Sequence, residues 1–272
     1  MQETAYAKLN LALHVRKRRE DGYHELETLF AFLDDGDRLT IAPADDFSLT
    51  ITGPFAAGLS AGPDNLVLRA ARLLAEANGL AASAHFTLDK RLPVASGIGG
   101  GSADAAAALR LAARLWGIGM DDVRPSDLAA QLGADVPACV ASQTCFGTGV
   151  GEQLEPIDGA ALAGAAVLLV NPLVACPTGP VFKAWDGTDR GALDPADWLH
   201  GRNDLEAPAV ALHPEIAGVL DALRGLQPRL ARMSGSGATC FAVLDHASQR
   251  DAAAARMAQD HPAWWQMRGS LR

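Results

Sequence analysis

A glycine-rich segment, Gly97-Ile98-Gly99-Gly100-Gly101-Ser102, runs directly into an alanine-rich stretch that has the composition of a helix. Glycine lets the backbone approach a ligand closely and adopt positive φ. The N–H groups at the start of a helix, together with the helix dipole, form a site for anions, and phosphate is the obvious ligand. Because four glycines within five residues exceed what one turn requires, the segment predicts a phosphate-binding loop.

The residues around this loop argue against two common nucleotide-binding motifs. A Walker A loop requires a lysine directly after its last glycine, and none follows Gly101. A Rossmann fingerprint requires a glycine where Ser102 stands and an acidic residue at a strand end about 20 residues later. Residues 117–121 of this chain do not resemble such a strand end. A phosphate loop of another kind is therefore expected.

Lys8, Asn10 and Asp135 are candidates for proton chemistry. Apolar and polar residues alternate from residue 5 to residue 15, which is typical of a strand and puts Lys8 and Asn10 on one face, about 6.5–7 Å apart. Lys8 belongs either to the polar side of a half-buried strand or to a functional site, and the chain has only four lysines. Asp135 stands two residues before a proline and is either a helix N-cap or a general base that accepts a hydroxyl proton.

Three further features carry weaker signals. The segment Ser234-Gly235-Ser236-Gly237 is explained by a hairpin turn unless other information favours a function. Tyr23 and His24 follow a turn and form either a solvated loop pair or a sandwich for a flat ring. Asp104, in the first turn of the expected helix, either suits the helix dipole or lies near a nucleotide-bound cation. The histidines lack the spacing of metal ligands, so no metal site made of protein side chains is predicted.

Composition narrows the function classes. The 272 residues are 49% hydrophobic and 20% charged, a balance that disfavours disorder. The formal net charge of −9 disfavours binding to nucleic acid or a membrane surface. The four cysteines are unpaired in pattern, and no signal peptide is evident, so we expect a cytoplasmic protein with reduced thiols. The longest apolar stretch, residues 160–170, is too short to span a bilayer.

Strands and helices mix along the chain without strict β-α-β alternation, which predicts the α+β class. Strands are expected at residues 37–41, 47–51 and 85–90, and residues 18–30 are expected to form a loop. A helix is expected to start at Asp64-Asn65 and end at Gly79, and another to run from an N-cap at Ser102 to Gly117. A glycine-rich boundary near residue 150 divides the chain into domains 1–150 and 151–272.

Three of these segments, in this order, resemble the motifs of the GHMP kinase superfamily, which includes galactokinase, homoserine kinase and mevalonate kinase. The motifs are matched by Ala5–Asn10, Pro93–Asp104 and Ser234–Ala238. The resemblance covers nearly the whole chain and implies a two-lobed fold with the active site between the lobes. The N-terminal domain would bind ATP, and the C-terminal domain would contribute to the substrate site.

Within the superfamily, the segments DGYHEL and NDLE are similar to those of members that act on an alcohol carrying a cytidine diphosphate. This resemblance implies transfer of the ATP γ-phosphate to the 2-hydroxyl of a diphosphocytidyl methylerythritol in the non-mevalonate isoprenoid pathway. ATP would enter with Mg²⁺, the partner would be this small molecule, and the protein would be a monomer or homodimer.

The resemblance also assigns roles to residues. Lys8 and Asp135 match the catalytic pair. The substrate side is matched by Asn10, Tyr23, His24, Phe30 and Phe182, with Tyr23 and Phe182 flanking the cytosine and His24 bonding its edge. The ATP side is matched by Asn65, Pro93, Val94, Ala95, Ser96, Gly97, Ile98, Gly99, Gly100, Gly101, Ser102 and Ala103.

Two alternatives remain open from the sequence. The chain could be another GHMP kinase, acting on a mevalonate-type or homoserine-type alcohol. It could also be a nucleotide-binding regulatory module without catalysis, although a module of that kind would be free to lose Lys8 or Asp135.

Overall fold

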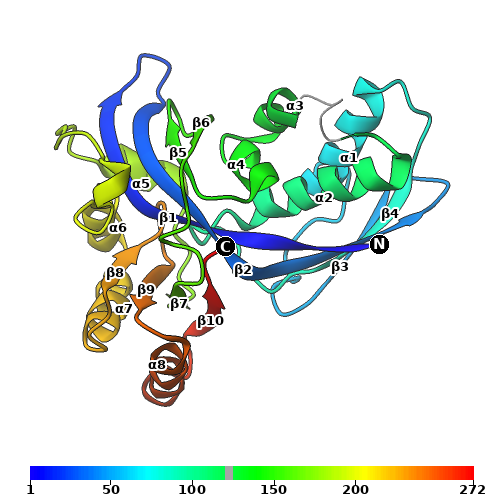
Figure 1. Cartoon of the computed structure of the whole chain (residues 1–272). Coiled ribbons are helices and arrows are strands. Elements are labelled where there is room, and N and C mark those ends of the chain that lie inside the picture. Colours follow the sequence, from blue (N-terminus) through cyan, green and yellow to red (C-terminus); the bar gives the residue numbers. More distant parts are fainter. Residues whose placement is uncertain (120–124) are drawn as a thin grey trace. The chain divides into compact units, whose positions relative to one another are not determined.

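The computed structural model describes residues 1–119 and 125–272 and shows the α+β protein that the sequence predicts (Figure 1). Its contacts group into two compact units. The first unit consists of Met1–Ala7, Asp35–Val94 and Gly99–Ser142, and the second of Lys8–Asp34, Ala95–Ile98 and Gln143–Arg272. The units thus interleave along the chain, and the assignment of ATP binding to residues 1–150 stays a prediction.

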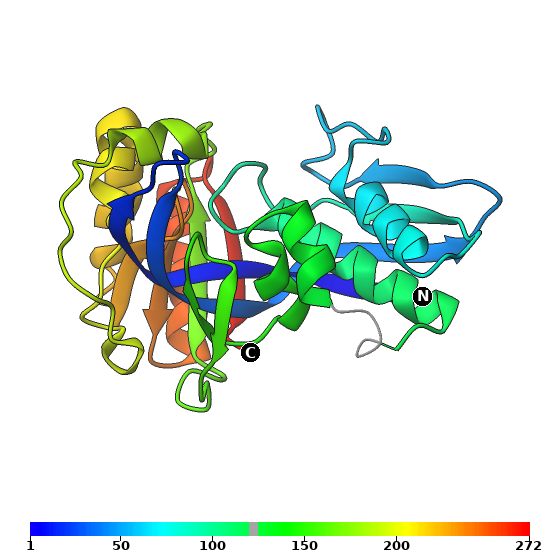
Figure 2. The same cartoon turned by 90° about the horizontal axis from the view of Figure 1, so that it is seen from above.

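In its described residues, the first unit contains a short sheet and four helices. Strand β4 (Ala84–Asp89) pairs antiparallel with residues 38–43 of β2 (His24–Pro43) and parallel with β3 (Ser48–Thr52). The helices are α1 (Leu66–Ala77), α2 (Gly100–Trp116), α3 (Pro125–Leu132) and α4 (Val136–Ala141). Helices α1 and α2 lie side by side in both views (Figures 1 and 2). The run of buried alanines in α2 leaves room for this close approach.

The ends of these helices test the predicted caps. Asn65 caps α1 as predicted, since its side chain accepts a hydrogen bond from the Val67 N–H. Gly117 ends α2 as predicted, in the left-handed conformation at φ 68°. The predicted N-cap at Ser102 is wrong, because Gly99 at φ 62° turns the chain earlier and α2 begins at Gly100. The sequence pattern alone does not show which residue adopts the left-handed conformation.

The expected loop over residues 18–30 is also wrong in its second half. The chain is extended from His24 onward, and β2 continues through the expected strand at 37–41 without a break. Residues Thr28–Phe30 pair antiparallel with β5 (Cys145–Thr148), which in turn pairs with β6 (Gln153–Pro156). A partner more than 100 residues away is not visible in a local pattern.

The second unit contains a four-stranded antiparallel sheet in the order β10-β7-β9-β8. Its strands are β7 (Ala166–Asn171), β8 (Leu230–Met233), β9 (Cys240–Leu244) and β10 (Trp265–Ser270). Helices α7 (Glu215–Arg224) and α8 (Ala247–Asp260) pack against it, as Figure 1 shows. Strand β1 (Gln2–Arg18), α5 (Thr178–Ala184), the short 3₁₀ turn Pro195–Asp197 and α6 (Glu206–Leu212) complete the elements.

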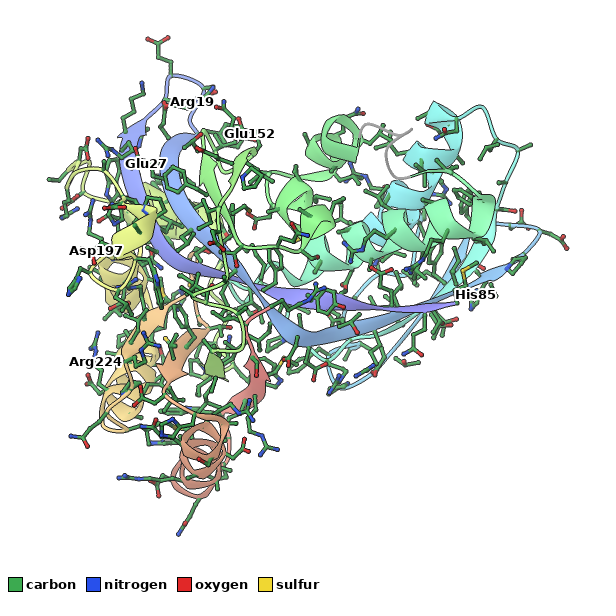
Figure 3. All side chains as sticks on the ribbon, viewed as in Figure 1. Arg19, Glu27, His85, Glu152, Asp197 and Arg224 are labelled. Atoms are coloured by element: carbon green, nitrogen blue, oxygen red, sulfur yellow. The ribbon has the colours of Figure 1, made fainter. Side chains whose placement is uncertain are left out.

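The long connection from α5 to α6 is tied to the strands by polar contacts. Glu27 of β2, labelled in Figure 3, accepts a hydrogen bond from the Leu193 N–H at 2.7 Å and pairs with Arg16 of β1 at 3.2 Å. The connection therefore has a defined course over β1, and this course brings residues 202–206 to the segments described next.

Candidate active site

Lys8 and Asn10 share one face of β1, as the alternation of the sequence predicts. Both side chains are buried, and Lys8 Nζ donates to Asn10 Oδ1 at 2.9 Å. Asn10 Nδ2 in turn donates to Thr28 Oγ1 at 2.8 Å. The Lys8 ammonium also lies 4.9 Å from the centre of the Phe30 ring, a favourable cation–π distance. The ammonium is thus held at a fixed position by an amide and an aromatic face.

Phe30, assigned to the substrate side, is itself buried and packs below Lys8. Its neighbour across the sheet is Cys145, whose thiol has a pKa raised to about 11 by burial, against a lowering influence of Lys8. The thiol of Cys145 and the ring of Phe30 thus both lie near the Lys8 ammonium. The assignment of Phe30 to the substrate side stays a prediction.

The second glycine segment lies directly against the first. Ser234 Oγ donates to the Gly97 carbonyl at 2.9 Å and accepts from the Asn10 N–H at 3.1 Å. Thr239 N–H donates to the Ser96 carbonyl at 3.1 Å, and Lys8 N–H donates to the Ile98 carbonyl at 3.0 Å. These bonds connect the phosphate-loop residues 95–98 to the strand that carries Lys8.

Gly97 has no room for a side chain. A Cβ there would lie 2.4 Å from the Ser234 carbonyl oxygen and 2.9 Å from Gly237 N, and the residue has a φ of 76°. Gly235 is similarly close to the Gly97 carbonyl. The turn Ser234–Gly237, for which the sequence alone gave only weak support, is therefore a backbone surface on which the first glycine segment rests.

Sequence reasoning did not assign a role to Asn203 or Glu206, which position this turn. Asn203 Nδ2 donates to the carbonyls of Met233 and Gly235, each at 2.8 Å. Glu206 Oε2 accepts from the Met233 N–H at 3.0 Å. The NDLE segment was a signal for this site, although its spacing to Gly235 could not show which groups it would contact.

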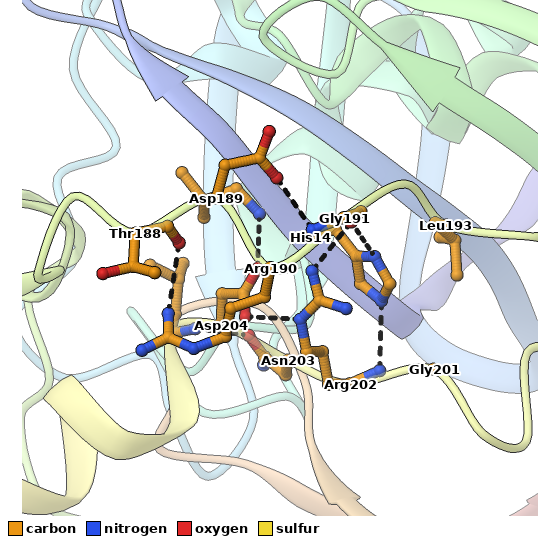
Figure 4. Close-up of polar contacts among 12 residues, drawn as sticks. His14, Thr188, Asp189, Arg190, Gly191, Leu193, Gly201, Arg202, Asn203 and Asp204 are labelled. Carbon is orange, nitrogen blue, oxygen red and sulfur yellow. Dashed lines mark hydrogen bonds and ion pairs between the residues drawn. The ribbon is translucent and has the colours of Figure 1, made fainter.

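The chain on either side of Asn203 is anchored to β1. Asp204 Oδ2 accepts from the Val15 N–H at 2.8 Å, and Arg202 Nε donates to Asp204 Oδ1 at 2.7 Å. His14 contacts the Gly191 carbonyl through Nδ1 and accepts from the Arg202 N–H through Nε2 (Figure 4). The carbonyl requires a proton on Nδ1, so the ring is the neutral tautomer. Burial and the Arg202 charge lower the pKa of His14, in keeping with this state.

His24 and Phe182 are brought together, as expected of residues that would bind a base. Their ring centres are 5.0 Å apart, and Trp185 meets the same imidazole edge-on at 5.7 Å. Arg18 Nε donates to His24 Nε2 at 3.3 Å, which leaves the ring proton on Nδ1. Burial and the Arg18 charge lower the pKa of His24. Tyr23 is 63% exposed, so the predicted aromatic flank on that side is a surface residue.

In the first unit, the start of α2 has the features of an anion site. Gly99 makes no side-chain cap, so the first N–H groups of α2 are not capped by its own N-terminal residue. Within the loop, Val94 is half exposed, and Ala95, which belongs to the second unit, has a φ of 50°, a strained conformation of the sort found at ligand sites. The Asn65 side chain is engaged by the Val67 N–H and the Ser60 carbonyl.

Asp135 occupies the N-cap position of α4, yet its side chain makes no capping hydrogen bond. The simple N-cap explanation of this residue is therefore wrong, although the position is the predicted one. Asp135 belongs to the first unit and Lys8 to the second. Its role as a general base stays a prediction.

The chain is similar to known kinases over its whole length. The family model for the GHMP kinases N terminal domain matches residues 65–143, and that for the GHMP kinases C terminal matches residues 188–263. A protein of Sphingopyxis alaskensis named 4-diphosphocytidyl-2-C-methyl-D-erythritol kinase is 53% identical over 100% of this chain and 99% of its own. One of Rhizorhabdus wittichii with the same name is 56% identical over 99% and 94%. This chain belongs to the GHMP kinase family.

Solved structures agree with the family. A crystal structure of 4-(cytidine 5'-diphospho)-2C-methyl-D-erythritol kinase matches with a TM-score of 0.85 at 35% identity, covering 100% of this chain and 99% of that one. A homoserine kinase from Cytophaga hutchinsonii matches with a TM-score of 0.70 at 17% identity, which shows the shared fold alone. As a GHMP kinase, the protein uses ATP to phosphorylate a small molecule.

The described residues contain neither a metal-binding cluster of side chains nor a helix suited to cross a membrane. Among residues 1–119 and 125–272, no three histidine, cysteine, aspartate or glutamate side chains gather closely enough to hold a metal ion. In the same part of the chain, no helix has the length and apolar character of a membrane span.

Proposed function

We propose that this GHMP kinase transfers the γ-phosphate of ATP to the 2-hydroxyl of 4-diphosphocytidyl-2-C-methyl-D-erythritol. The observation that carries the proposal is full-length identity of 53–56% to relatives that bear the name of this kinase. The paired rings of His24 and Phe182 support it, because a base needs an aromatic face and a polar edge.

For the nucleotide, the uncapped start of α2 and the glycines before it would offer backbone N–H groups to the phosphates. Mg²⁺ would enter with ATP and neutralise phosphate charge. Such an ion would take most of its ligands from phosphates and water.

For the transfer itself, positioning and charge neutralisation dominate, because the transition state of phosphoryl transfer is loose. Lys8 is held by Asn10 and Phe30 and would stabilise the developing charge. Asp135, whose carboxylate does not cap α4, would accept the hydroxyl proton.

For the cytosine, the neutral His24 ring would donate from Nδ1 to an acceptor on the base edge, since Nε2 accepts from Arg18. Phe182 would stack on the face of the base, and Tyr23, which is exposed here, would cover the other face.

An ADP-release assay with separate acceptors tests the proposal. Release of ADP should depend on the diphosphocytidyl alcohol and should be absent with mevalonate or homoserine as the acceptor. His24→Ala should raise the KM for the diphosphocytidyl alcohol and leave the KM for ATP unchanged. Turnover of mevalonate or homoserine at a comparable rate would assign the chain to another GHMP activity, and ATP binding without any turnover would favour the regulatory alternative.

A further inference from the structure

A buried ionic cluster lies at the base of α2, and the proposed chemistry makes no use of it. Lys90 Nζ donates to Asp37 Oδ2 at 2.5 Å and to Asp104 Oδ2 at 2.6 Å, and all three side chains are at least 95% buried. Asp37 comes from β2, Lys90 follows β4 directly, and Asp104 belongs to α2. Three separate elements of the first unit therefore meet at one ammonium group.

The cluster fixes the chain where it enters the phosphate loop. Asp37 Oδ1 accepts from the backbone N–H groups of Arg91 at 2.5 Å and Leu92 at 2.8 Å. The backbone of Lys90 is also fixed, because its N–H donates to Thr52 and its carbonyl accepts from Phe55. The loop begins at the next residue, Pro93, so its first end is held at three consecutive positions.

The same cluster fixes the chain where it leaves the loop. Asp104 stands one turn into α2, and a Cβ on Gly100 would lie only 3.1 Å from Lys90 Nζ, so the first turn of α2 rests on the ammonium. Lys90 is thus a direct link between the residues before the loop and the helix after it.

Neither charge attraction nor stability explains this arrangement well. One ammonium with two carboxylates cannot attract a triphosphate by net charge. Asp104 Oδ1 has no hydrogen-bond partner among the described residues, and a buried ionic group that is only partly satisfied contributes little to stability. What the cluster does provide is a fixed distance between the two ends of the loop.

We infer that Asp104, acting through Lys90 and Asp37, is a positioning residue for the ATP phosphate loop. The inference rests on the proposed assignment of residues 93–103 to ATP. A loop with fixed ends presents its N–H groups in the binding geometry before ATP arrives, so less conformational freedom is lost on binding. Loosening one end should therefore weaken ATP binding more than it slows the transfer of phosphate.

The same helix supplies a matched control. Glu3 of β1 pairs with Arg110 and Arg114, two to three turns further along α2, and its side chain is also mostly buried. Glu3→Ala detaches the later part of α2 from a strand, as Asp104→Ala detaches its beginning. Both changes remove a carboxylate from an ion pair of the first unit, but only Asp104 adjoins the loop.

The experiment compares Asp104→Ala, Asp104→Asn and Glu3→Ala by steady-state kinetics, with ATP and the acceptor varied in turn, and by ADP binding calorimetry. Asp104→Ala should raise the KM for ATP and the Kd for ADP about tenfold, with kcat and the acceptor KM changed less than about threefold. Asp104→Asn, which can still accept from Lys90, should restore most of the affinity. Glu3→Ala should lower the melting temperature without changing either constant for the nucleotide.

Equal nucleotide effects of Asp104→Ala and Glu3→Ala would overturn the inference, as would unchanged nucleotide constants in Asp104→Ala. If Asp104→Ala does not fold, Asp104→Ser, whose hydroxyl is too short to reach Lys90, carries the same expectation. Failure of the proposed function is distinguishable, because it appears as missing turnover in the unmodified protein, while the ADP affinities still test the loop.

Discussion

The two glycine-rich segments look alike in sequence and differ in what their glycines do. At Gly235 and at Gly97, the missing side chains let one backbone lie on another within the protein. At Gly101, by contrast, a Cβ would meet only Leu66 Cδ1 at an ordinary 3.6 Å, so nothing inside the protein demands a glycine there. If the start of α2 binds the ATP phosphates as proposed, a glycine at this position would serve the approach of the ligand.

Both glycine segments are expected to position groups and neither to react, so the largest loss of rate should come from another residue. Asp135→Asn removes the proposed base and should lower kcat by about 10²–10⁴-fold. Urea unfolding of the same variant separates a loss of rate from a loss of stability. Turnover is measured by ADP release, with ADP affinity as the control. A kcat near that of the unmodified protein would remove Asp135 from the mechanism.

The second largest effect should be a loss of stability where the two glycine segments touch. Gly97→Ala forces a Cβ against the Ser234 carbonyl and puts alanine at a φ of 76°, which should cost about 3 kcal/mol or more of unfolding free energy. Gly164→Ala is the control, since Gly164 has a φ of 80° with nothing within 4 Å and tests the strain alone. Urea unfolding of both variants measures the difference. Equal losses in the two would mean that the backbone contact at Gly97 can relax.

How much of this could be predicted follows from the range of the interactions. The alternation of β1 placed Lys8 and Asn10 on one face, because that relation is local. The cap at Asn65 and the end of α2 at Gly117 are local in the same way. The phosphate loop was predicted as one unit, yet Gly97 is closely packed and Gly101 is not. The partner that makes this difference, Ser234, lies 137 residues away from Gly97.

The residues that sequence reasoning missed all act through distant backbone groups. Asn203 contacts carbonyls about 30 residues away, and Asp37 contacts N–H groups more than 50 residues away. Asp104 was expected either to suit the helix dipole or to lie near a cation, but it pairs with Lys90. The scarcity of lysine was a useful signal here, since two of the four lysines, Lys8 and Lys90, are buried and hydrogen-bonded.

The third prediction separates ligand binding from folding at Gly101. Gly101→Ala should raise the unfolding free energy by roughly 0.5–1 kcal/mol, because alanine is a better helix former and the Cβ has room. It should nevertheless weaken ADP binding about tenfold if the phosphates approach this backbone. Gly218→Ala in α7, where nothing lies within 4 Å, is the matched control.

In that control, stability should rise by a similar amount and ADP affinity should stay the same. Binding is measured by calorimetry and stability by urea unfolding, on the same preparations. ADP affinity that survives in Gly101→Ala would place the phosphates away from the start of α2, and the two glycine segments would then differ only in how tightly they pack.

The smallest expected effect is on the pH dependence of stability. Its sign should differ between Asp104, next to the first glycine segment, and His14, which anchors the chain that contacts the second. Burial raises the pKa of Asp104 to about 7 from its ordinary 3.8, despite the Lys90 charge, while the nearby Asp37 carboxylate raises it further. Between these values the folded chain binds more protons than the unfolded chain, so this contribution to stability decreases as pH rises from about 4 to 7.

His14, which anchors the chain beside Asn203, should behave in the opposite way. Burial and Arg202 lower its pKa below 6.5, so the unfolded chain takes up the proton first and stability is lost as pH falls below that value, despite partial compensation from Asp204 and Glu27. Urea unfolding from pH 5 to 8 measures both slopes, with Asp104→Asn removing the first and His14→Gln the second. If neither substitution changes the dependence of unfolding free energy on pH, other titratable groups control it. The regions beside the two glycine segments then have no separate response to pH.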